Sequence, residues 1–256
     1  MYRPRKRFGQ NFLVDPTTIQ SLVSAIAPSQ SDSILEIGPG LGALTKPLLS
    51  KLNQLEVVEL DRDLLCHLEK LPTTEQQLII HHIDALKFNF SDTPHPRRIV
   101  GNLPYNISTP LIFHLLDQLP FIIDMHFMLQ KEVVERLCAK SGDRNFGRLS
   151  AMVQSKCSTE LLLHVSADSF SPKPKVDSAF LRLTPLKNQI VPEHLSQSFQ
   201  DIVKKCFSQP RKTLANNLKN IIPRETIESN GIDPSIRPQQ LQLEQLVLLA
   251  KLNKNQ

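Results

Sequence analysis

The segment Asn102-Leu103-Pro104-Tyr105 combines residue types that could bind and activate an amino group on a purine ring. Adenine N6 is a poor nucleophile because its lone pair is delocalised into the ring. The Asn102 side-chain oxygen and the Leu103 backbone carbonyl could accept from both N6 hydrogens and aim the lone pair at an electrophilic methyl group. Pro104 would fix the turn that presents the carbonyl, and Tyr105 would stack on the base. The proton leaves after transfer, so catalysis would depend on proximity and electrostatic positioning, without a metal or a strong base.

A glycine-rich turn earlier in the chain could bind a nucleotide-like cofactor. The apolar stretch 33–38 runs into Gly38-Pro39-Gly40-Leu41-Gly42, where glycines permit a tight turn and a close approach to a ligand. Glu59 lies 21 residues after Gly38, at the end of a second apolar stretch, where a carboxylate can accept both ribose hydroxyls. Asp84 ends a third stretch and could accept from the cofactor adenine. These features suit a dinucleotide or S-adenosylmethionine, and the Asn102 segment favours S-adenosylmethionine because it requires a methyl donor.

The apolar stretches alternate with helical patterns over the first 185 residues and predict an α/β fold. Plausible crossover helices cover 43–52 and 62–71. No convincing helix separates the last two strands, so we expect the sheet to end in an antiparallel hairpin. The fold class is therefore a Rossmann-like, doubly wound and mostly parallel seven-stranded sheet. The predicted strands are 33–38, 55–60, 77–84, 98–102, 124–130, 161–165 and 179–183.

A proline-bracketed polar stretch, 184–193, predicts a linker to a small all-α domain. We expect a catalytic domain over 1–186 and a helical RNA-recognition domain over 187–256. Arg237-Pro238 is a start signal for the last helix. The predicted helices cover 195–207, 212–220, 224–229 and 239–252.

Composition narrows the class of protein further. The chain has 256 residues, and its four cysteines are far apart, which is typical of reduced cytosolic thiols rather than of a disulfide or metal framework. It has no apolar run of membrane-spanning length and no secretory signal pattern, so we expect a cytoplasmic protein that does not bind membranes. The net charge of +5 is concentrated at the two ends of the chain, which favours contact with a polyanion.

Motifs in order along almost the whole chain resemble the KsgA-type ribosomal RNA adenine dimethyltransferases. The resemblance implies S-adenosylmethionine-dependent transfer of two methyl groups to each of two adjacent adenosines in the hairpin loop near the 3′ end of small-subunit (16S) ribosomal RNA. It also implies a role in ribosome biogenesis, with the RNA presented in a pre-assembled small subunit, and we expect a monomer. The motifs are R-K-R-F-G-Q-N-F-L (5–13), L-E-I-G-P-G-L-G-A-L-T (35–45), V-E-L-D-R-D-L (58–64), D-A-L (84–86), N-L-P-Y-N-I-S-T-P (102–110), M-L-Q-K-E-V-V-E-R-L (128–137), F-S-P-K-P-K-V-D-S-A (170–179) and R-K-T-L-A-N-N-L (211–218).

The motifs and the resemblance together assign roles to three groups of residues. Catalysis is assigned to Asn102, Leu103, Pro104 and Tyr105, together with Phe170, whose ring could stack on the other face of a flipped adenine. The cofactor-binding residues are Gln10, Asn11, Leu13, Gly38, Gly40, Gly42, Glu59, Leu60, Asp84, Ala85 and Asn102. The RNA-binding residues are Arg5, Lys6, Arg7, Lys173, Lys175, Arg211 and Lys212.

The sequence departs from its relatives at a few positions. Pro210 and Ala215 stand where relatives often carry arginine, which weakens the RNA contact expected of that helix, and Phe146 stands in place of an expected tyrosine. Three other functions remain as alternatives: a large-subunit RNA adenine dimethylase of the antibiotic-resistance type, a DNA adenine methyltransferase and a non-catalytic ribosome assembly factor. The loop 170–178 favours the small-subunit type, and Leu103 breaks the double proline that DNA enzymes usually have.

Overall fold

The computed structural model describes residues 10–74, 76–92 and 95–254, which form two compact units. The first unit comprises the chain up to Val134 together with Glu160–Pro185. The second comprises Glu135–Thr159 and the chain from Leu186 onward. The boundary drawn from the sequence at 186/187 places 135–159 with the sheet, whereas in the structure this segment belongs to the unit of the C-terminal helices.

Hydrogen bonds explain why 135–159 joins the second unit. The backbone N–H of Gly142 donates to the Gln239 carbonyl at 2.7 Å, and the Ser141 hydroxyl donates to the Gln240 carbonyl at 3.0 Å. The Leu186 N–H donates to the Lys156 carbonyl at 2.9 Å. These partners are distant in sequence, so helix and strand patterns alone could not reveal them.

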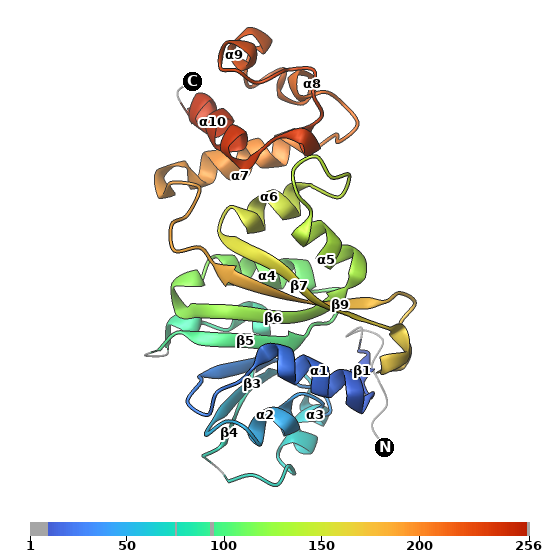
Figure 1. Ribbon diagram of the computed structural model, residues 1–256. Helices are drawn as coiled ribbons and strands as arrows, with labels where there is room; N and C mark the ends of the chain where they lie inside the picture. Colours follow the sequence, from blue (N-terminus) through green and yellow to red (C-terminus); the bar gives the residue numbers. More distant parts are fainter. Residues whose placement is uncertain (1–9, 75, 93–94, 255–256) are drawn as a thin grey trace. The chain divides into compact units, whose positions relative to one another are not determined.

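The described part of the first unit is built on a seven-stranded, mostly parallel sheet, as predicted (Figure 1). β2 pairs in parallel with β3 and β5, β3 pairs in parallel with β4, and β5 with β6, while β9 runs antiparallel to β6. Every residue of β2 is buried, as expected of a strand covered on both faces. The strand order is β4 (Leu78–His82), β3 (Leu55–Glu59), β2 (Ile34–Ile37), β5 (Arg97–Asn102), β6 (Ile122–Gln130), β9 (Ser178–Pro185) and β7 (Cys157–Val165).

Helices cover both faces of this sheet, and Figure 1 shows α1 in front of it and α4 behind it. The crossover helices are shorter than predicted. Because the glycine-rich turn continues to Leu44, helix α2 begins at Thr45, two residues later than expected. Asp61 caps α3 by accepting from the Asp63 N–H at 3.1 Å. The helices are α1 (Pro16–Ile26), α2 (Thr45–Leu49), α3 (Arg62–Leu68) and α4 (Ser108–Leu116), with short 3₁₀ turns at η2 (Ala85–Lys87), η3 (Phe90–Asp92), η4 (Leu119–Phe121) and η5 (Ala167–Ser169). Helix α5 (Lys131–Cys138) begins in the first unit and ends in the second.

A second, two-stranded sheet was not predicted from the sequence. β1 (Phe12–Leu13) pairs antiparallel with β8 (Phe170–Ser171), with Leu13 opposite Phe170. The N–H groups of Val14 and Asp15 both donate to the Ser169 carbonyl, which extends the connection. Strands of two residues carry no readable alternation of polar and apolar residues, so the sequence could not indicate this pairing. The sheet fixes the segment before α1 to the loop before β9.

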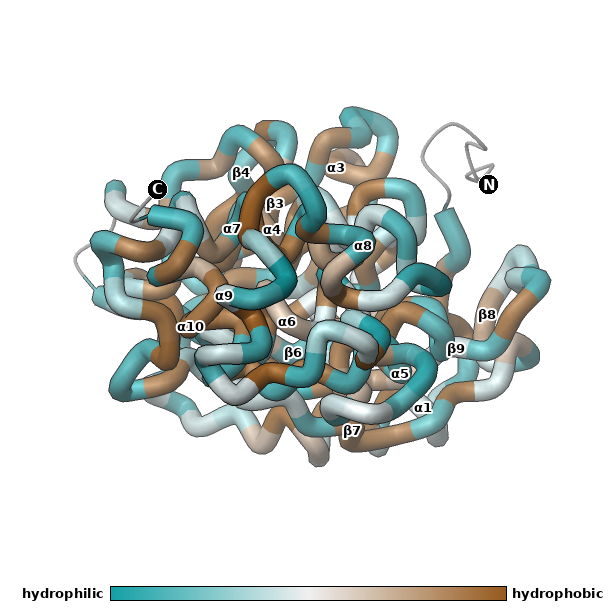
Figure 2. Tube along the Cα trace, turned by 90° about the horizontal axis from the view of Figure 1, so that it is seen from above, coloured by the Kyte–Doolittle hydropathy of each residue, from teal (hydrophilic) through white to brown (hydrophobic). Residues whose placement is uncertain are grey.

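The second unit is helical, as predicted, with the addition of the middle segment. Helix α7 buries Phe199, Ile202, Val203 and Cys206, which recur at helical spacing, and Figure 2 shows hydrophilic and hydrophobic residues alternating along the helices of this unit. Pro238 opens a 3₁₀ turn instead of the last helix. The elements are α6 (Arg148–Gln154), η6 (Glu193–Leu195), α7 (Ser196–Cys206), α8 (Leu214–Leu218), α9 (Arg224–Ser229), η7 (Pro238–Gln240) and α10 (Leu243–Lys254). None of the helices in the described ranges is long and apolar enough to cross a membrane.

Arg98 joins three elements of the first unit at the amino end of the sheet. Its guanidinium donates to Asp124 on β6 at 3.1 Å, to Asp32 at 2.7 Å and to the Ile26 carbonyl at the end of α1 at 2.7 Å. The Arg98 side chain is only 12% exposed. Burial opposes ionisation of Asp124, but the His126 ring 3.5 Å away and the hydrogen bonds from Arg98 outweigh it and hold the pKa of this carboxyl below its usual value.

Arg98→Met should lower the free energy of unfolding by about 3 kcal/mol at pH 7, because it leaves Asp124 partly buried without its cation. The ion pair between Arg98 and Asp124 stabilises the fold at pH values above the ordinary pKa of an aspartate. This stabilisation is lost as the pH falls through the lowered pKa of Asp124. Urea unfolding should therefore show the two proteins converging below about pH 4. The matched control, Arg182→Met, removes an exposed pair with Glu160 and should cost less than about 1 kcal/mol. Equal losses in both variants would contradict this account.

Candidate active site

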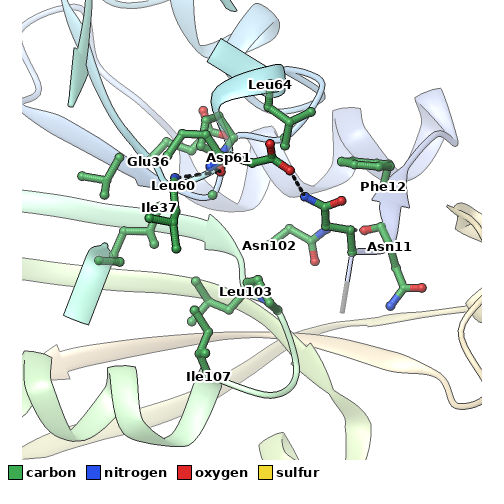
Figure 3. Close-up of a pocket in the computed structure, with 18 of the residues that line it drawn as sticks. Asn11, Phe12, Glu36, Ile37, Leu60, Asp61, Leu64, Asn102, Leu103 and Ile107 are labelled. Carbon is green, nitrogen blue, oxygen red and sulfur yellow. Dashed lines mark hydrogen bonds between the residues drawn. The ribbon is translucent and has the colours of Figure 1, made fainter. Parts of the chain in front are cut away.

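The carboxyl edge of the sheet forms one pocket, to which four strand ends and the segment before α1 contribute. The turn after β2, the residues after β3 and β4 and the segment after β5 surround it, and Figure 3 shows Glu36, Asp61, Asn102 and Asn11 around the same space. An open parallel sheet binds its ligand at this edge. The pocket brings together these predicted residues: Gln10, Asn11, Leu13, Gly38, Gly40, Glu59, Leu60, Asp84, Ala85, Asn102, Leu103, Pro104 and Tyr105.

The glycine-rich turn requires glycine for two different reasons. Gly38, Gly40 and Gly42 have φ values of +68°, +57° and +83°, which L side chains rarely adopt. A Cβ on Gly40 would also lie 3.1 Å from two ring carbons of Phe12, so this glycine permits close packing of the segment before α1. Gly42 does not line the pocket; its N–H donates to the Pro39 carbonyl at 2.9 Å and closes the turn. Gly42 therefore shapes the turn, and the cofactor contact predicted for it stays a prediction.

The end of β3 presents a buried carboxylate. Glu59 is 8% exposed, and its Oε1 accepts from the N–H groups of Leu60 at 2.9 Å and Asp61 at 2.8 Å. Burial raises the pKa of Glu59, and backbone donors including Gly40 offset part of that rise. Backbone N–H groups of Gly40, Leu60 and Asp61 therefore orient the Glu59 carboxylate. The exposed side chain of Leu60 lines the same pocket.

The end of β4 places Asp84 and Ala85 at the same pocket. Asp84 Oδ1 accepts from the Leu86 N–H at 3.0 Å and so caps the 3₁₀ turn η2. Capping uses one carboxylate oxygen, and Asp84 still lines the pocket. Ile83, 37% exposed, adds an apolar side chain to the rim.

The Asn102 side chain has a defined orientation because its amide is anchored. Asn102 Nδ2 donates to the Asn11 backbone carbonyl at 3.1 Å, which leaves Oδ1 as the acceptor that the side chain offers. Leu103 is buried, and its N–H donates to the Met128 carbonyl at 3.2 Å. The hydroxyl of Tyr105 lies 2.8 Å from the Ser178 hydroxyl, which fixes the ring at the pocket. Burial, offset in part by this hydrogen bond, raises the pKa of Tyr105, so the phenol stays protonated at neutral pH.

The segment before α1 is tied to the pocket at two points. Gln10 Nε2 donates to Asp61 Oδ2 at 3.3 Å, as the dashed line in Figure 3 shows, and the Asn11 carbonyl accepts from Asn102. The β1–β8 pairing holds the same segment from the other side. Residues distant in the sequence are thereby fixed around one space.

Phe170 lies in the core in this structure, and the stacking role predicted for it stays a prediction. Its side chain is 4% exposed and belongs to the hydrophobic core, in the cluster that includes Leu13, Val165 and Phe180. It does not line the pocket. Since Phe170 begins β8 opposite Leu13, its placement favours a packing role that supports the segment before α1.

The predicted RNA-binding residues are surface residues where the structure describes them. Lys175, Arg211 and Lys212 are exposed, and Lys173 forms an exposed ion pair with Asp168 at 2.5 Å. Arg5, Lys6 and Arg7 lie outside the described residues.

Several pocket residues were missed by sequence reasoning, among them Phe12, Glu36 and Asp61. Gly101, which does not line the pocket, was missed as well: a Cβ there would lie 2.6 Å from the Ile37 carbonyl oxygen, so only glycine fits before Asn102. A charged residue inside the apolar stretch 33–38 was a signal for Glu36. The described lining contains four carboxyl groups, from Glu36, Glu59, Asp61 and Asp84, and no lysine, arginine or histidine.

The fold and the strand-end carboxylates are those of a Rossmann-like nucleotide-binding enzyme, and comparisons define the class further. The ribosomal RNA adenine dimethylase family matches residues 1–254. The ribosomal RNA small subunit methyltransferase A of Tolumonas auensis is 50% identical over 97% of this chain and 94% of its own length. A dimethyladenosine transferase from Plasmodium falciparum superimposes with a TM-score of 0.79 at 27% identity, covering 95% of this chain and 97% of that one. The 23S rRNA methyltransferase ErmE superimposes with a TM-score of 0.76 at 25% identity, covering 95% of this chain and 100% of that one.

These matches confirm the predicted class of enzyme, an S-adenosylmethionine-dependent methyltransferase that acts on ribosomal RNA. The chain belongs to the ribosomal RNA adenine dimethylase family.

Phe170 variants can separate a packing role from a stacking role. Phe170→Ala should lower the free energy of unfolding by about 3–5 kcal/mol, because it leaves a cavity under β1. Phe170→Leu retains most of the buried volume and should cost less than about 1.5 kcal/mol. If Phe170 only packs, the leucine variant should keep the wild-type kcat and KM for RNA. A leucine variant of near wild-type stability with strongly reduced RNA methylation would restore the stacking role.

Proposed function

We propose that this enzyme dimethylates N6 of two adjacent adenosines in the hairpin loop near the 3′ end of small-subunit ribosomal RNA, with S-adenosylmethionine as the methyl donor. The observation that carries the proposal is the anchored Asn102 amide, which offers its oxygen at the pocket formed by the glycine turn, Glu59 and Asp84. The small-subunit target is supported by the Tolumonas auensis relative, which is a ribosomal RNA small subunit methyltransferase A. The reaction would take place in the cytoplasm, where ribosomal subunits assemble.

The charge of the pocket supports S-adenosylmethionine over a dinucleotide, the choice that the glycine turn alone leaves open. S-adenosylmethionine carries a sulfonium and an ammonium against one carboxylate, so it is a net cation. A dinucleotide carries a pyrophosphate, which would meet four carboxyl groups and no basic side chain among the described lining residues. In this proposal Glu59 would accept from the ribose hydroxyls and Asp84 from the adenine amino group.

The chain would promote the reaction by orienting the target base. The cofactor supplies an electrophilic methyl group. Asn102 Oδ1 and the Leu103 carbonyl would accept from the two N6 hydrogens and leave the lone pair directed at that methyl group. Tyr105 would stack on the base, with its ring held through Ser178. Because the proton leaves only after transfer, water can accept it, and the described pocket needs no strong base.

The second unit is the proposed RNA-recognition surface. Its two sequence segments carry fifteen basic and eight acidic residues, whereas the segments of the first unit carry fifteen basic and seventeen acidic. The basic excess therefore belongs to the unit that includes 135–159, with Arg211 and Lys212 exposed on it. We extend the predicted RNA contacts, which include Arg5, Lys6, Arg7, Lys173 and Lys175, to this unit as a whole. A monomer acting on a pre-assembled small subunit is the proposed state.

The substrate proposal can be tested with labelled S-adenosylmethionine and four acceptors in parallel: unmethylated small subunits, large subunits, bare small-subunit RNA and DNA. We expect label in small subunits, on two adjacent adenosines located by mapping the modified bases. Label confined to large subunits would support the resistance-type alternative instead. Binding to small subunits without any methylation would indicate an assembly factor.

Asn102→Ala should abolish methylation in this assay and leave S-adenosylmethionine affinity within about tenfold, since it removes an N6 acceptor rather than a cofactor contact of comparable strength. Calorimetric titration would measure the affinity. Asn188→Ala, which removes an exposed amide outside the pocket lining, serves as the control and should remain active. Turnover by Asn102→Ala near the wild-type rate would disprove the acceptor role.

Glu59→Ala should weaken S-adenosylmethionine binding by about 1–3 kcal/mol, the cost of leaving the ribose hydroxyls and nearby backbone donors unpaired. Calorimetry on the folded variant would measure this loss. Glu69→Ala, at an exposed position after α3, removes the same charge outside the pocket and should bind normally. Unchanged affinity in Glu59→Ala would exclude the ribose contact.

A further inference from the structure

Stacking on a base uses only the ring of Tyr105, so the proposed mechanism leaves its hydroxyl without a chemical role. Phenylalanine would stack as well, because stacking requires only an aromatic face. The chain has twelve phenylalanines and only two tyrosines, so the choice of tyrosine at the pocket points to a use for the hydroxyl. Burial raises the pKa of this phenol, which keeps its proton at neutral pH and therefore cannot accept the proton of the reaction.

The hydroxyl of Tyr105 is one end of a buried hydrogen bond. It lies 2.8 Å from the hydroxyl of Ser178, a fully buried residue that does not line the pocket. The backbone of Tyr105 is held as well, because the Ser108 hydroxyl donates to its carbonyl at 3.2 Å. The phenolic oxygen lies on the long axis of the ring. Fixing that oxygen and the backbone therefore fixes the direction of the ring at the pocket.

The antiparallel strand β9 brings Ser178 to this edge of the sheet. The parallel strands end here, whereas β9 begins here, with Ser178 as its first residue opposite Gln130 of β6. The preceding residue is fixed too: the Asp177 carbonyl accepts from the Lys131 N–H at 3.0 Å, and its Oδ1 accepts from the Ala167 N–H at 3.0 Å. The partner of the phenol thus belongs to the sheet, which gives the ring a firm support.

We propose that Ser178 is a positioning residue for methyl transfer, which holds the Tyr105 ring in the direction that lets it stack on the target adenine. This inference rests on the proposed function, in which the ring stacks on that base. Without the hydrogen bond the ring can turn about its Cα–Cβ bond, and each turnover would first have to restore the stacking direction. Loss of the bond should therefore lower kcat, while the cofactor contacts at Glu59 and Asp84 are unaffected.

Ser178→Ala and Tyr105→Phe remove the same hydrogen bond from its two ends. With unmethylated small subunits as acceptor, each should lower kcat about fivefold, as expected for one net hydrogen bond, and leave the KM for S-adenosylmethionine within about twofold. The double variant should lose no more than either single variant, because the second change removes nothing further. Losses that multiply in the double variant, or an unchanged kcat in Ser178→Ala, would overturn the proposal.

Tyrosine fluorescence gives a readout that a purely structural role of Ser178 would not change. The chain has no tryptophan, and Tyr2 is its other tyrosine, so in a Tyr2→Phe background the emission comes from Tyr105 alone. Time-resolved anisotropy without ligands should decay faster in Ser178→Ala, because the ring gains freedom, and an unchanged decay would contradict the proposal. The matched control is Ser169→Ala, which removes a hydroxyl pair with Thr18 at 3.0 Å outside the pocket lining and should change neither kcat nor the decay.

Thermal melting checks that each variant is folded. If Ser178→Ala does not fold, Ser178→Cys replaces it in both measurements, since cysteine is close in size but a weak hydrogen-bonding partner. A Tyr105→Ala variant that methylates at the wild-type rate would show that the stacking step of the proposed function is wrong. The anisotropy decay would still report whether Ser178 holds the ring, so the two failures are distinguishable.

Discussion

Parallel pairing of β2 with β3 on one side and β5 on the other is the constraint from which the site follows. The register aligns Ile37 with Val58 and Glu36 with Val100, so the glycine turn, Glu59 and Asn102 emerge at the same edge. Glu59 and Asn102 are the last residues of their strands, and Gly38 follows directly after β2, so all three line the pocket at this edge. Burial of β2 on both faces makes that alignment costly to disturb, because a slip by one residue would move every side chain to the opposite face, where the packing partners differ.

The edge of the sheet supplies most of the pocket, and the segment before α1 completes it. This segment is held by the β1–β8 sheet, by Gln10 on Asp61 and by the bond from Asn102 to the Asn11 carbonyl. The last of these connects the segment to the proposed catalytic side chain and orients its amide. The pocket and the Asn102 side chain therefore belong to one hydrogen-bonded structure, and Phe170 packs in the core opposite Leu13 without lining the pocket.

Opposite charges in the two units suit two different ligands. The pocket has carboxyl groups alone among its charged side chains within the described residues, which suits a cationic methyl donor. The second unit has a basic excess, which suits the phosphate backbone of RNA. On this distribution of charge, a polyanion would be attracted to the second unit rather than to the acidic pocket.

The sequence by itself determined the parallel sheet, the strand ends that bear Gly38, Glu59, Asp84 and Asn102, and the family, because these depend on local periodicity and on short motifs. Only the tertiary structure decided what depends on contacts distant in the chain. It placed Phe170 in the core, moved 135–159 to the helical unit and put Glu36 in the pocket without a cation. Whether a side chain is buried, exposed or paired is set by which segments pack against it, and a pattern read along one segment does not contain that information.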